Sequence, residues 1–297
     1  MAREFNEIRD IIEDSTVNRR RTCIVQKYIH NPLLINRRKF DIRTYALITS
    51  HNGNLKAYLY EEGYLRTSSR EYSINNLGNK LVHLTNDAVQ KRSEDYGKFE
   101  PGNKLSFNEF QMFIDKNYPD LNICFERDIL PQMNKMTVDI FRACHGKLDP
   151  KRRLHCMEVF GLDFMIDDEF KIYLIEVNTN PCLELSCPLL ARLIPNMLEN
   201  AFKIGLDSLF LPPENFSSKK AFIGDACPEN RFTLCYDDRI DGPVLDKLFK
   251  SKENVIGKFF PMILTFLKSK WTKMNLAMTR TCTTMKNEHF INIILQK

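Results

Sequence analysis

Hydrophobic and polar side chains alternate with a period of two between residues 39 and 49, which predicts a β-strand. Asn52-Gly53 follows and supplies the positive φ angles of a tight hairpin turn, so residues 55–60 are the expected return strand. Before this hairpin, residues 3–13 show the spacing of a short amphipathic helix, and residues 21–29 form an apolar run typical of a buried strand.

A long polar connection follows, from Glu61 to about Leu105, and a structureless connection of this length is usually functional. Ser106 then begins a predicted helix, with Glu109 three residues on as in a capping box. A second helix is predicted over residues 123–144.

A second hairpin is predicted from two apolar runs, residues 156–166 and 170–177, which are separated by the acidic turn residues 167–169. Ser186 and Pro188 then start a helix with one apolar face, which we expect to end near residue 210. Antiparallel hairpins with helices between them indicate an α+β fold.

The character of the chain changes after Pro213, because the remaining residues are polar with weak periodicity. We therefore predict two parts, a main region over residues 1–213, which contains all of the candidate site residues described below, and a C-terminal extension of unknown role over residues 214–297.

Composition narrows the class of protein only slightly. The 297 residues, 43% hydrophobic and 27% charged, are typical of a globular chain, and the net charge of +5 is mildly basic. Nine cysteines without a CxxC pair argue against a disulfide framework or a zinc site, and the N-terminus is too charged for a signal peptide. The longest apolar run, residues 255–267, is too short to span a bilayer, so we expect a cytoplasmic protein.

Two carboxylates and an amide stand out in the second hairpin. Glu176 and Asn178 are two residues apart on a strand and therefore leave the same face, and pairing about the turn sets Asp163 beside them. Buried carboxylates need cations. Oxygen ligands of this kind suit Mg²⁺ held against a nucleotide, while salt bridges to lysine or arginine on neighbouring strands are the open alternative.

Charged residues also share one face of the first predicted strand. Lys39, Asp41 and Arg43 alternate with apolar residues, so they either line a site for phosphate oxygens or lie on an exposed strand edge. Arg66, on the polar connection, is suited to a reacting carboxylate or acyl phosphate, or is simply exposed to solvent.

Two further stretches are weaker candidates. His83, Thr85 and Asn86 stand at the start of a predicted helix, where backbone N–H groups accept anions, although local capping explains Thr85 and Asn86 equally well. Residues 26–29 end a strand, and their backbone groups are suited to an adenine edge or are an ordinary strand terminus.

Several segments in order resemble the tubulin-tyrosine-ligase-like family of the ATP-grasp superfamily: RKFDIRTY, YLRTSS, HLTNDAVQK, YGKFEPGN, FGLDFMID and LIEVN. The resemblance covers residues 21–210 and implies an ATP-grasp-like α+β fold with a largely antiparallel sheet flanked by helices. It also implies that the family's N-terminal part, with a phosphate-covering loop, lies before the matched region. A non-catalytic microtubule-binding or regulatory remnant is therefore one alternative.

The resemblance implies roles for individual residues. It makes Asp163, Glu176 and Asn178 the Mg²⁺ ligands and Arg66 the arginine at the acyl phosphate. It places Lys39, Asp41 and Arg43 around the phosphates and substrate, with Lys39, Arg43 and Arg66 as catalytic residues. The implied nucleotide-binding residues are Gln26, Lys27, Tyr28, Ile29, Lys39, Asp41, His83, Thr85 and Asn86.

The implied reaction is the ATP-dependent joining of tyrosine, glutamate or glycine to a tubulin carboxylate through an acyl phosphate. ATP and Mg²⁺ are the expected cofactors, and the acidic tails of tubulin or microtubules and a free amino acid are the expected partners. We expect no nucleic acid or membrane partner. The cytoskeleton, with the cilium or basal body, is the expected location. A ligase acting on another carboxylate is the rival enzyme.

Overall fold

The computed structural model describes residues 23–207, 209–210, 230–250 and 291–295. The chain divides into two compact units. Residues 31–242 form one unit and carry the large sheet, whereas residues 1–30 and 243–297 form the other. In this second unit, β1 (Cys23–Lys27) pairs antiparallel with β9 (Ile291–Leu295). The amphipathic helix predicted at residues 3–13 lies outside the described residues.

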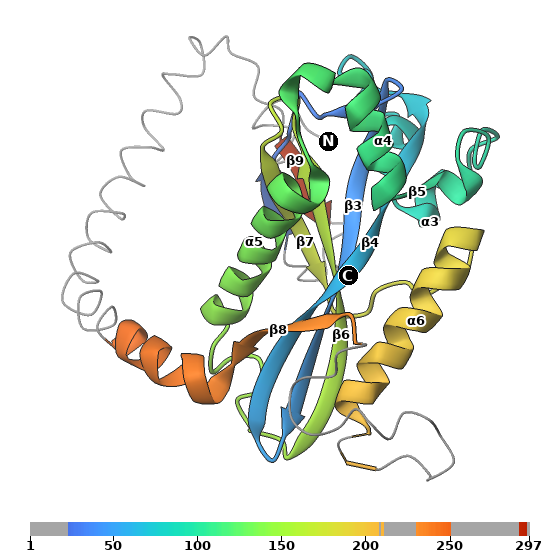
Figure 1. Cartoon of the computed structure of the whole chain (residues 1–297). Coiled ribbons are helices and arrows are strands. Elements are labelled where there is room, and N and C mark those ends of the chain that lie inside the picture. Colours follow the sequence, from blue (N-terminus) through green and yellow to red (C-terminus); the bar gives the residue numbers. More distant parts are fainter. Residues whose placement is uncertain (1–22, 208, 211–229, 251–290, 296–297) are drawn as a thin grey trace, which may run out of the picture. The chain divides into compact units, whose positions relative to one another are not determined.

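A seven-stranded antiparallel sheet is the centre of the large unit, with the order β5-β4-β3-β6-β7, and with β2 paired to β3 and β8 to β4 (Figure 1). This confirms the predicted α+β fold with a largely antiparallel sheet. The strands are β2 (Leu34–Ile35), β3 (Arg38–His51), β4 (Asn54–Glu71), β5 (Lys104–Ser106), β6 (His155–Ile166), β7 (Ile172–Asn178) and β8 (Phe232–Asp237).

Helices cover both faces of this sheet, with α5 (Leu130–Ala143) and α6 (Pro188–Gly205) on opposite sides (Figure 1). α6 buries its apolar stripe against Tyr45, Leu47 and neighbouring tyrosines. On the opposite face, α4 (Phe107–Asn117) places Phe110 against Phe40, with 5.2 Å between the ring centroids. A π-helical turn (Phe125–Ile129) precedes α5. Alternate residues of β3 point to opposite faces, so Lys39, Asp41 and Arg43 lie on the same face as Tyr45 and Leu47. α6 covers this face at Tyr45 and Leu47.

Local signals in the sequence predicted several of these elements correctly. Asn52 and Gly53 have φ angles of 51° and 74° and form the hairpin turn between β3 and β4. Ser106 caps α4, and its side chain accepts from the backbone N–H of Glu109 while the carboxylate of Glu109 accepts from that of Ser106. The β6–β7 hairpin and α6 are also confirmed, although α6 ends at Gly205.

The return strand is much longer than the predicted residues 55–60, because β4 continues to Glu71. The pairing between β3 and β4 shifts register where Thr44 lies opposite Gly63, and the chain resumes as a strand beyond the irregularity. A Cβ on Gly63 would lie 2.3 Å from the carbonyl oxygen of Arg43, so only glycine permits this approach. Arg66 therefore lies in a strand, and its prediction on a loop is wrong.

The connection from β4 to β5 is shorter and more ordered than the sequence suggested. It contains α2 (Lys80–His83), α3 (Asp87–Gln90) and a 3₁₀ turn (Pro101–Asn103). The buried Gln90 accepts from the backbone N–H of Ser69 at 2.7 Å, and the buried Asn103 donates to the carbonyl of Thr67 at 3.0 Å. These bonds fasten the connection to β4.

Residues beyond the predicted boundary near residue 213 contribute β8 to the sheet, and residues 238–250 are helical. The boundary itself stays a prediction.

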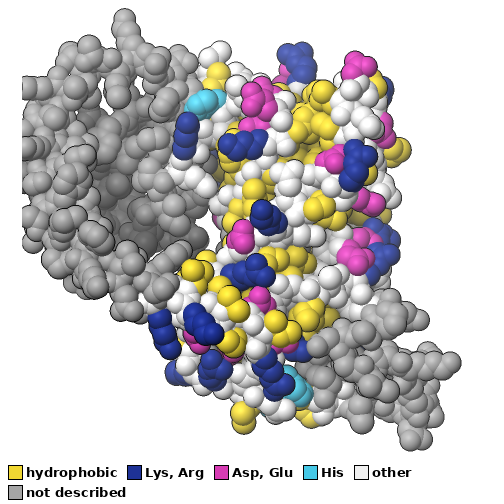
Figure 2. Space-filling view, turned by 60° about the vertical axis from the view of Figure 1, so that its left-hand side comes forward, with side chains coloured by type: hydrophobic (Ala, Val, Ile, Leu, Met, Phe, Trp, Pro, Cys, Tyr) yellow, Lys and Arg dark blue, Asp and Glu magenta, His cyan; other side chains and the backbone are white. Residues whose placement is uncertain are grey.

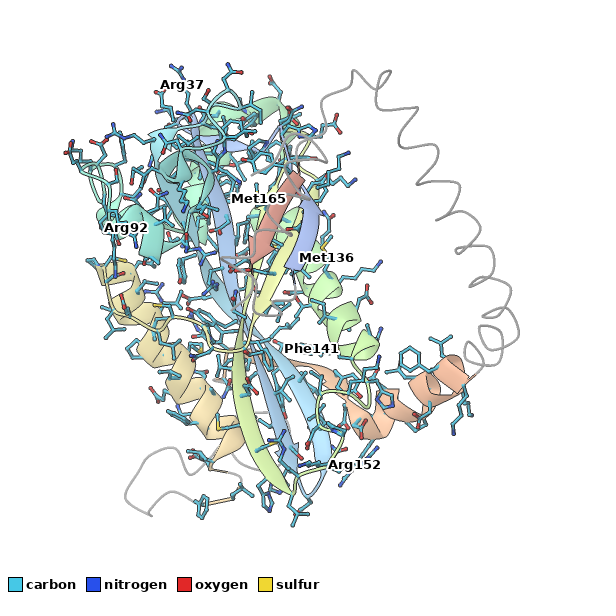
Figure 3. All side chains as sticks on the ribbon, turned by 180° about the vertical axis from the view of Figure 1, so that it is seen from behind. Arg37, Arg92, Met136, Phe141, Arg152 and Met165 are labelled. Carbon is cyan, nitrogen blue, oxygen red and sulfur yellow. The ribbon has the colours of Figure 1, made fainter. Side chains whose placement is uncertain are left out.

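Arg37 and Arg152 lie at opposite ends of the sheet in Figure 3. Within the described residues, no helix combines the length and apolar character needed to cross a bilayer.

Candidate active site

A row of charged side chains crosses the middle of the sheet. Asp163 on β6 lies opposite Arg43 on β3 and opposite Glu176 on β7. Two residues before Arg43 on the same strand, Asp41 lies opposite Arg66 on β4. Side chains at directly paired positions lie on the same face of a sheet, so the pairing alone gathers these groups on one surface.

The three predicted metal ligands converge. The side-chain nitrogen of Asn178 lies 3.4 Å from Oδ2 of Asp163 and 3.1 Å from Oε1 of Glu176. Asn178 donates with its nitrogen here, so ligation of a cation requires rotation of the amide to present its oxygen. Among the described residues, no three His, Cys, Asp or Glu side chains form a metal cluster; this set instead combines two carboxylates with one amide.

Two arginines from neighbouring strands bind Asp163. Arg43 donates through Nε to Oδ1 at 2.5 Å and through a terminal nitrogen to Oδ2 at 3.0 Å, and Arg66 donates to Oδ2 at 2.7 Å. Burial alone would raise the pKa of Asp163, but the Arg66 and Arg43 guanidinium groups hold that pKa at about 2. The salt-bridge alternative is therefore realised for Asp163.

Glu176 differs from its neighbour in its electrostatics. Burial raises the pKa of Glu176, and the adjacent Asp163 carboxylate raises it further. Two neighbouring carboxylates repel each other unless a proton or a cation lies between them. Together with the hard oxygen donors, this repulsion fits a divalent ion such as Mg²⁺.

β3 is a central strand and not an edge strand, since it pairs with β4 on one side and β6 on the other. Lys39 and Arg43 are each 5% exposed, so the interpretation of an exposed strand edge is wrong. The ammonium of Lys39 donates to the carbonyl oxygen of His83 at 3.0 Å. Burial lowers the pKa of Lys39 to about 8, although Asp41 acts in the opposite direction.

Arg66 is buried as well, which excludes simple solvent exposure. It donates through Nε to Oδ1 of Asp41 at 2.7 Å and through a terminal nitrogen to Oδ2 at 2.5 Å, in addition to its bond with Asp163. One guanidinium thus joins carboxylates from β3 and β6.

The polar stretch on the connection lies partly beside this site. His83 ends α2, is buried, and reaches the site through the bond from Lys39 to its carbonyl. Thr85 is buried, whereas Asn86 is exposed and occupies the N-cap position of α3 without a side-chain capping bond. Their nucleotide role stays a prediction.

The four predicted adenine residues belong to the other unit of the chain. Gln26 and Lys27 end β1, and Tyr28 and Ile29 follow it. Their role also stays a prediction.

Lys104 is a charged residue of this site that the sequence interpretation missed. It pairs with Arg66 across β5 and β4, is buried, and donates to Asp87 at 2.5 Å. Burial lowers its pKa, although Asp87 acts in the opposite direction. A lysine that follows a turn containing Gly102 carries no local signal of burial, so only the strand pairing identifies it.

Comparison with protein families matches residues 3–217, more than half of the chain, to the Tubulin-tyrosine ligase family. The chain belongs to this family. The match spans all of the residues in the charged row and agrees with the ordered motifs of the sequence.

Individual relatives are tubulin-modifying enzymes by their names. The chain is 39% identical over 188 residues to Tubulin glycylase 3A of Drosophila melanogaster and 37% identical over 187 residues to Tubulin glycylase 3D of Tetrahymena thermophila, in each case 62% of this chain and 18% of the relative. It is 29% identical over 239 residues to the Probable alpha-tubulin polyglutamylase Ttll1 of Tetrahymena thermophila, 79% of this chain and 55% of the relative. The chain thus spans about a fifth of the glycylases and about half of the polyglutamylase.

Proposed function

We propose that this chain contributes the metal and phosphate site of an ATP-dependent ligase that joins an amino acid to a tubulin carboxylate. The observation that supports this most strongly is the convergence of Asp163, Glu176 and Asn178 beside two buried arginines. When bound, Mg²⁺ and ATP would supply the phosphoryl group that activates the carboxylate as an acyl phosphate, which an amino group then converts to an amide with loss of phosphate.

The chain's own groups fit this chemistry. The two carboxylates and the amide would hold Mg²⁺, and Arg43 and Arg66, which both bind Asp163, would neutralise charge on the transferred phosphoryl group. No protein nucleophile is required. Glycine is our first candidate for the amino acid, because the glycylases include the relatives with 37% and 39% identity, and glutamate is the second.

Tubulin, or the microtubule, is the proposed acceptor, and the cytoskeleton, including cilia, the proposed location. Lys and Arg side chains are interspersed with Asp and Glu on the face seen in Figure 2. Charges of both signs mix on that face, so an acidic tail bound there would be recognised by individual side chains.

The test is ligation of radiolabelled glycine or glutamate to microtubules by the whole chain and by Glu176→Gln. This substitution removes the charge with little change in volume and relieves the repulsion from Asp163, so we expect about a 10³-fold loss of ligation with a melting temperature no lower than that of the wild type. Ligation near the wild-type rate in Glu176→Gln would exclude the metal assignment. A wild-type chain that binds microtubules but neither Mg²⁺·ATP nor either amino acid would favour the non-catalytic alternative.

A further inference from the structure

Two histidines lie side by side at one end of the large sheet. His51 is the last residue of β3 and His155 is the first residue of β6, and the two are directly paired across these strands. Their imidazole rings meet edge to face with 5.3 Å between the ring centroids. His155 is exposed and His51 is partly exposed, so solutes can reach this pair.

This end of the sheet is remote from the candidate active site. Asp163 lies eight residues beyond His155 on β6, which corresponds to about 26 Å along an extended strand. Arg152, three residues before His155, marks the same end of the sheet in Figure 3. Any ligand of the histidine pair is therefore separate from the Mg²⁺ and phosphate groups discussed above.

The ring nitrogens of the pair make no bonds to the rest of the described protein. In the part of the chain that the structure describes, neither His51 nor His155 takes part in a hydrogen bond or an ion pair. By contrast, the rings of His83 and His145 each bond to a neighbouring oxygen at 2.8 Å. The pair thus presents imidazole nitrogens from two adjacent strands to a ligand.

The backbone that carries the two histidines is held in place. The hydroxyl of Ser50 donates to the carbonyl of Arg153 at 2.5 Å. The N–H group of Gly53 donates to the carbonyl of Leu154 at 3.3 Å. The torsion that turns an imidazole ring about its Cβ–Cγ bond is soft and leaves the ring centroid almost unmoved. The ring nitrogens can therefore be turned towards a common point at the observed centroid separation.

That separation suits a shared metal ion. A tetrahedral ion held by two imidazole nitrogens at about 2.0–2.1 Å places the two ring centroids about 5 Å apart, and the observed distance is 5.3 Å. Imidazole suits Zn²⁺, Cu²⁺ and Ni²⁺, whereas Mg²⁺ prefers oxygen. Because no third His, Cys, Asp or Glu joins the pair within the described residues, the other coordination positions are left to water.

We propose that His51 and His155 form an open two-histidine site for a divalent transition metal ion, of which Zn²⁺ is the first candidate. Zn²⁺ is favoured as the probe because it has no redox chemistry and accepts imidazole ligands readily. The alternative is an aromatic pair without a metal, in which the edge-to-face contact only stabilises the end of the sheet. A phenyl ring in place of one imidazole keeps the aromatic contact and removes the nitrogen ligands, so it separates the two explanations.

The test is calorimetric titration of the whole chain with Zn²⁺ in excess Mg²⁺, for the wild type, His51→Phe and His155→Gln, with His30→Gln as the control that removes an imidazole outside the pair. We expect His51→Phe and His155→Gln each to weaken the binding of one Zn²⁺ ion by at least about 10-fold, because even loss of a group that only orients a ligand costs about that much. His30→Gln should bind this ion as the wild type does. Equal Zn²⁺ affinity in all four proteins would leave only the aromatic pair and overturn the proposal.

A second readout uses the wild-type chain and holds even if a variant does not fold. Nuclear magnetic resonance of nitrogen-labelled histidine reports metal binding at the ring nitrogens themselves. We expect the ring signals of His51 and His155 to shift together on addition of one equivalent of Zn²⁺, while those of His83 and His145 stay in place. A shift at only one ring of the pair, or at neither, contradicts a shared ion.

Discussion

Two buried arginine–carboxylate clusters share strands β3 and β4 of this sheet and are built differently. Near the start of β3, Arg38 forms a two-pronged ion pair with Glu100, and Thr67 donates to the same carboxylate at 2.9 Å. One arginine thus meets one carboxylate. In the candidate active site, by contrast, Asp163 is shared by two arginines and lies next to Glu176, a second carboxylate with a raised pKa.

This difference distinguishes a structural ion pair from a candidate site. Glu100 fastens the β4–β5 connection to the sheet, and its charge is matched within the protein. Around Asp163, two carboxylates face each other on one side and two arginines face each other on the other, so like charges are held close together. Such an arrangement costs folding free energy and is expected where ligands bring compensating charge.

The largest expected effect comes from removing the shared carboxylate. Asp163→Asn takes away a proposed metal ligand and leaves Arg43 and Arg66 facing each other without a counter-charge. We expect loss of ligation by more than 10³-fold, and a fall in unfolding free energy of about 3–5 kcal/mol at pH 7, as for other broken buried pairs. Ligation assays together with urea denaturation measure both effects. Retained ligation would show that Asp163 is a structural partner only.

Loss of the structural ion pair between Arg38 and Glu100 should lower stability and leave ligation largely unchanged. Glu100→Ala leaves the buried Arg38 without its carboxylate, which we expect to cost about 3–5 kcal/mol of unfolding free energy. Ligation measured well below the melting temperature should stay above about a tenth of the wild-type rate, because Glu100 does not contact the proposed metal ligands. A loss of ligation as large as that in Asp163→Asn, in a variant that is still folded, would remove the distinction between the clusters.

Replacement of the buried Lys39 should raise the stability of the protein and lower its ligation activity. The folded-state pKa of Lys39 is about 8, below its ordinary value of 10.5, so stability is lost as the pH falls from 10.5 towards 8 and stays reduced below that. Lys39→Met removes this penalty, and we expect a gain of about 1–3 kcal/mol at pH 7 that disappears above about pH 10.5, with ligation lowered. Urea denaturation at pH 7 and pH 10.5 measures it. A variant that is less stable at pH 7 would show that Lys39 acts as a structural pair like Arg38.

The sequence predicted those parts of the fold that depend on a few neighbouring residues. The Asn52-Gly53 turn and the capping box at Ser106 are of this kind, because each is stabilised within four residues. The far half of β4 was not predicted, since Arg66 and the serines after it are polar, and polar residues in a strand resemble a loop until their buried partners are known. β8 was missed because its partner strand lies more than 170 residues earlier in the chain.

The candidate site shows the same limit. Strand periodicity was enough to place Glu176 and Asn178 on one face and to bring Asp163 beside them. It did not show that Arg66 reaches across β3 to Asp163, because that contact depends on the register between β4, β3 and β6.

The most direct test of the account is metal binding to the ligand set. Electron paramagnetic resonance of Mn²⁺, which replaces Mg²⁺ at oxygen sites, should show one bound ion in the wild-type chain with a non-hydrolysable ATP analogue. The account predicts that Asp163→Asn and Glu176→Gln each weaken this binding by at least 10-fold, whereas Glu100→Gln leaves it unchanged. Equal Mn²⁺ affinity in all four proteins would contradict a metal site at Asp163, Glu176 and Asn178.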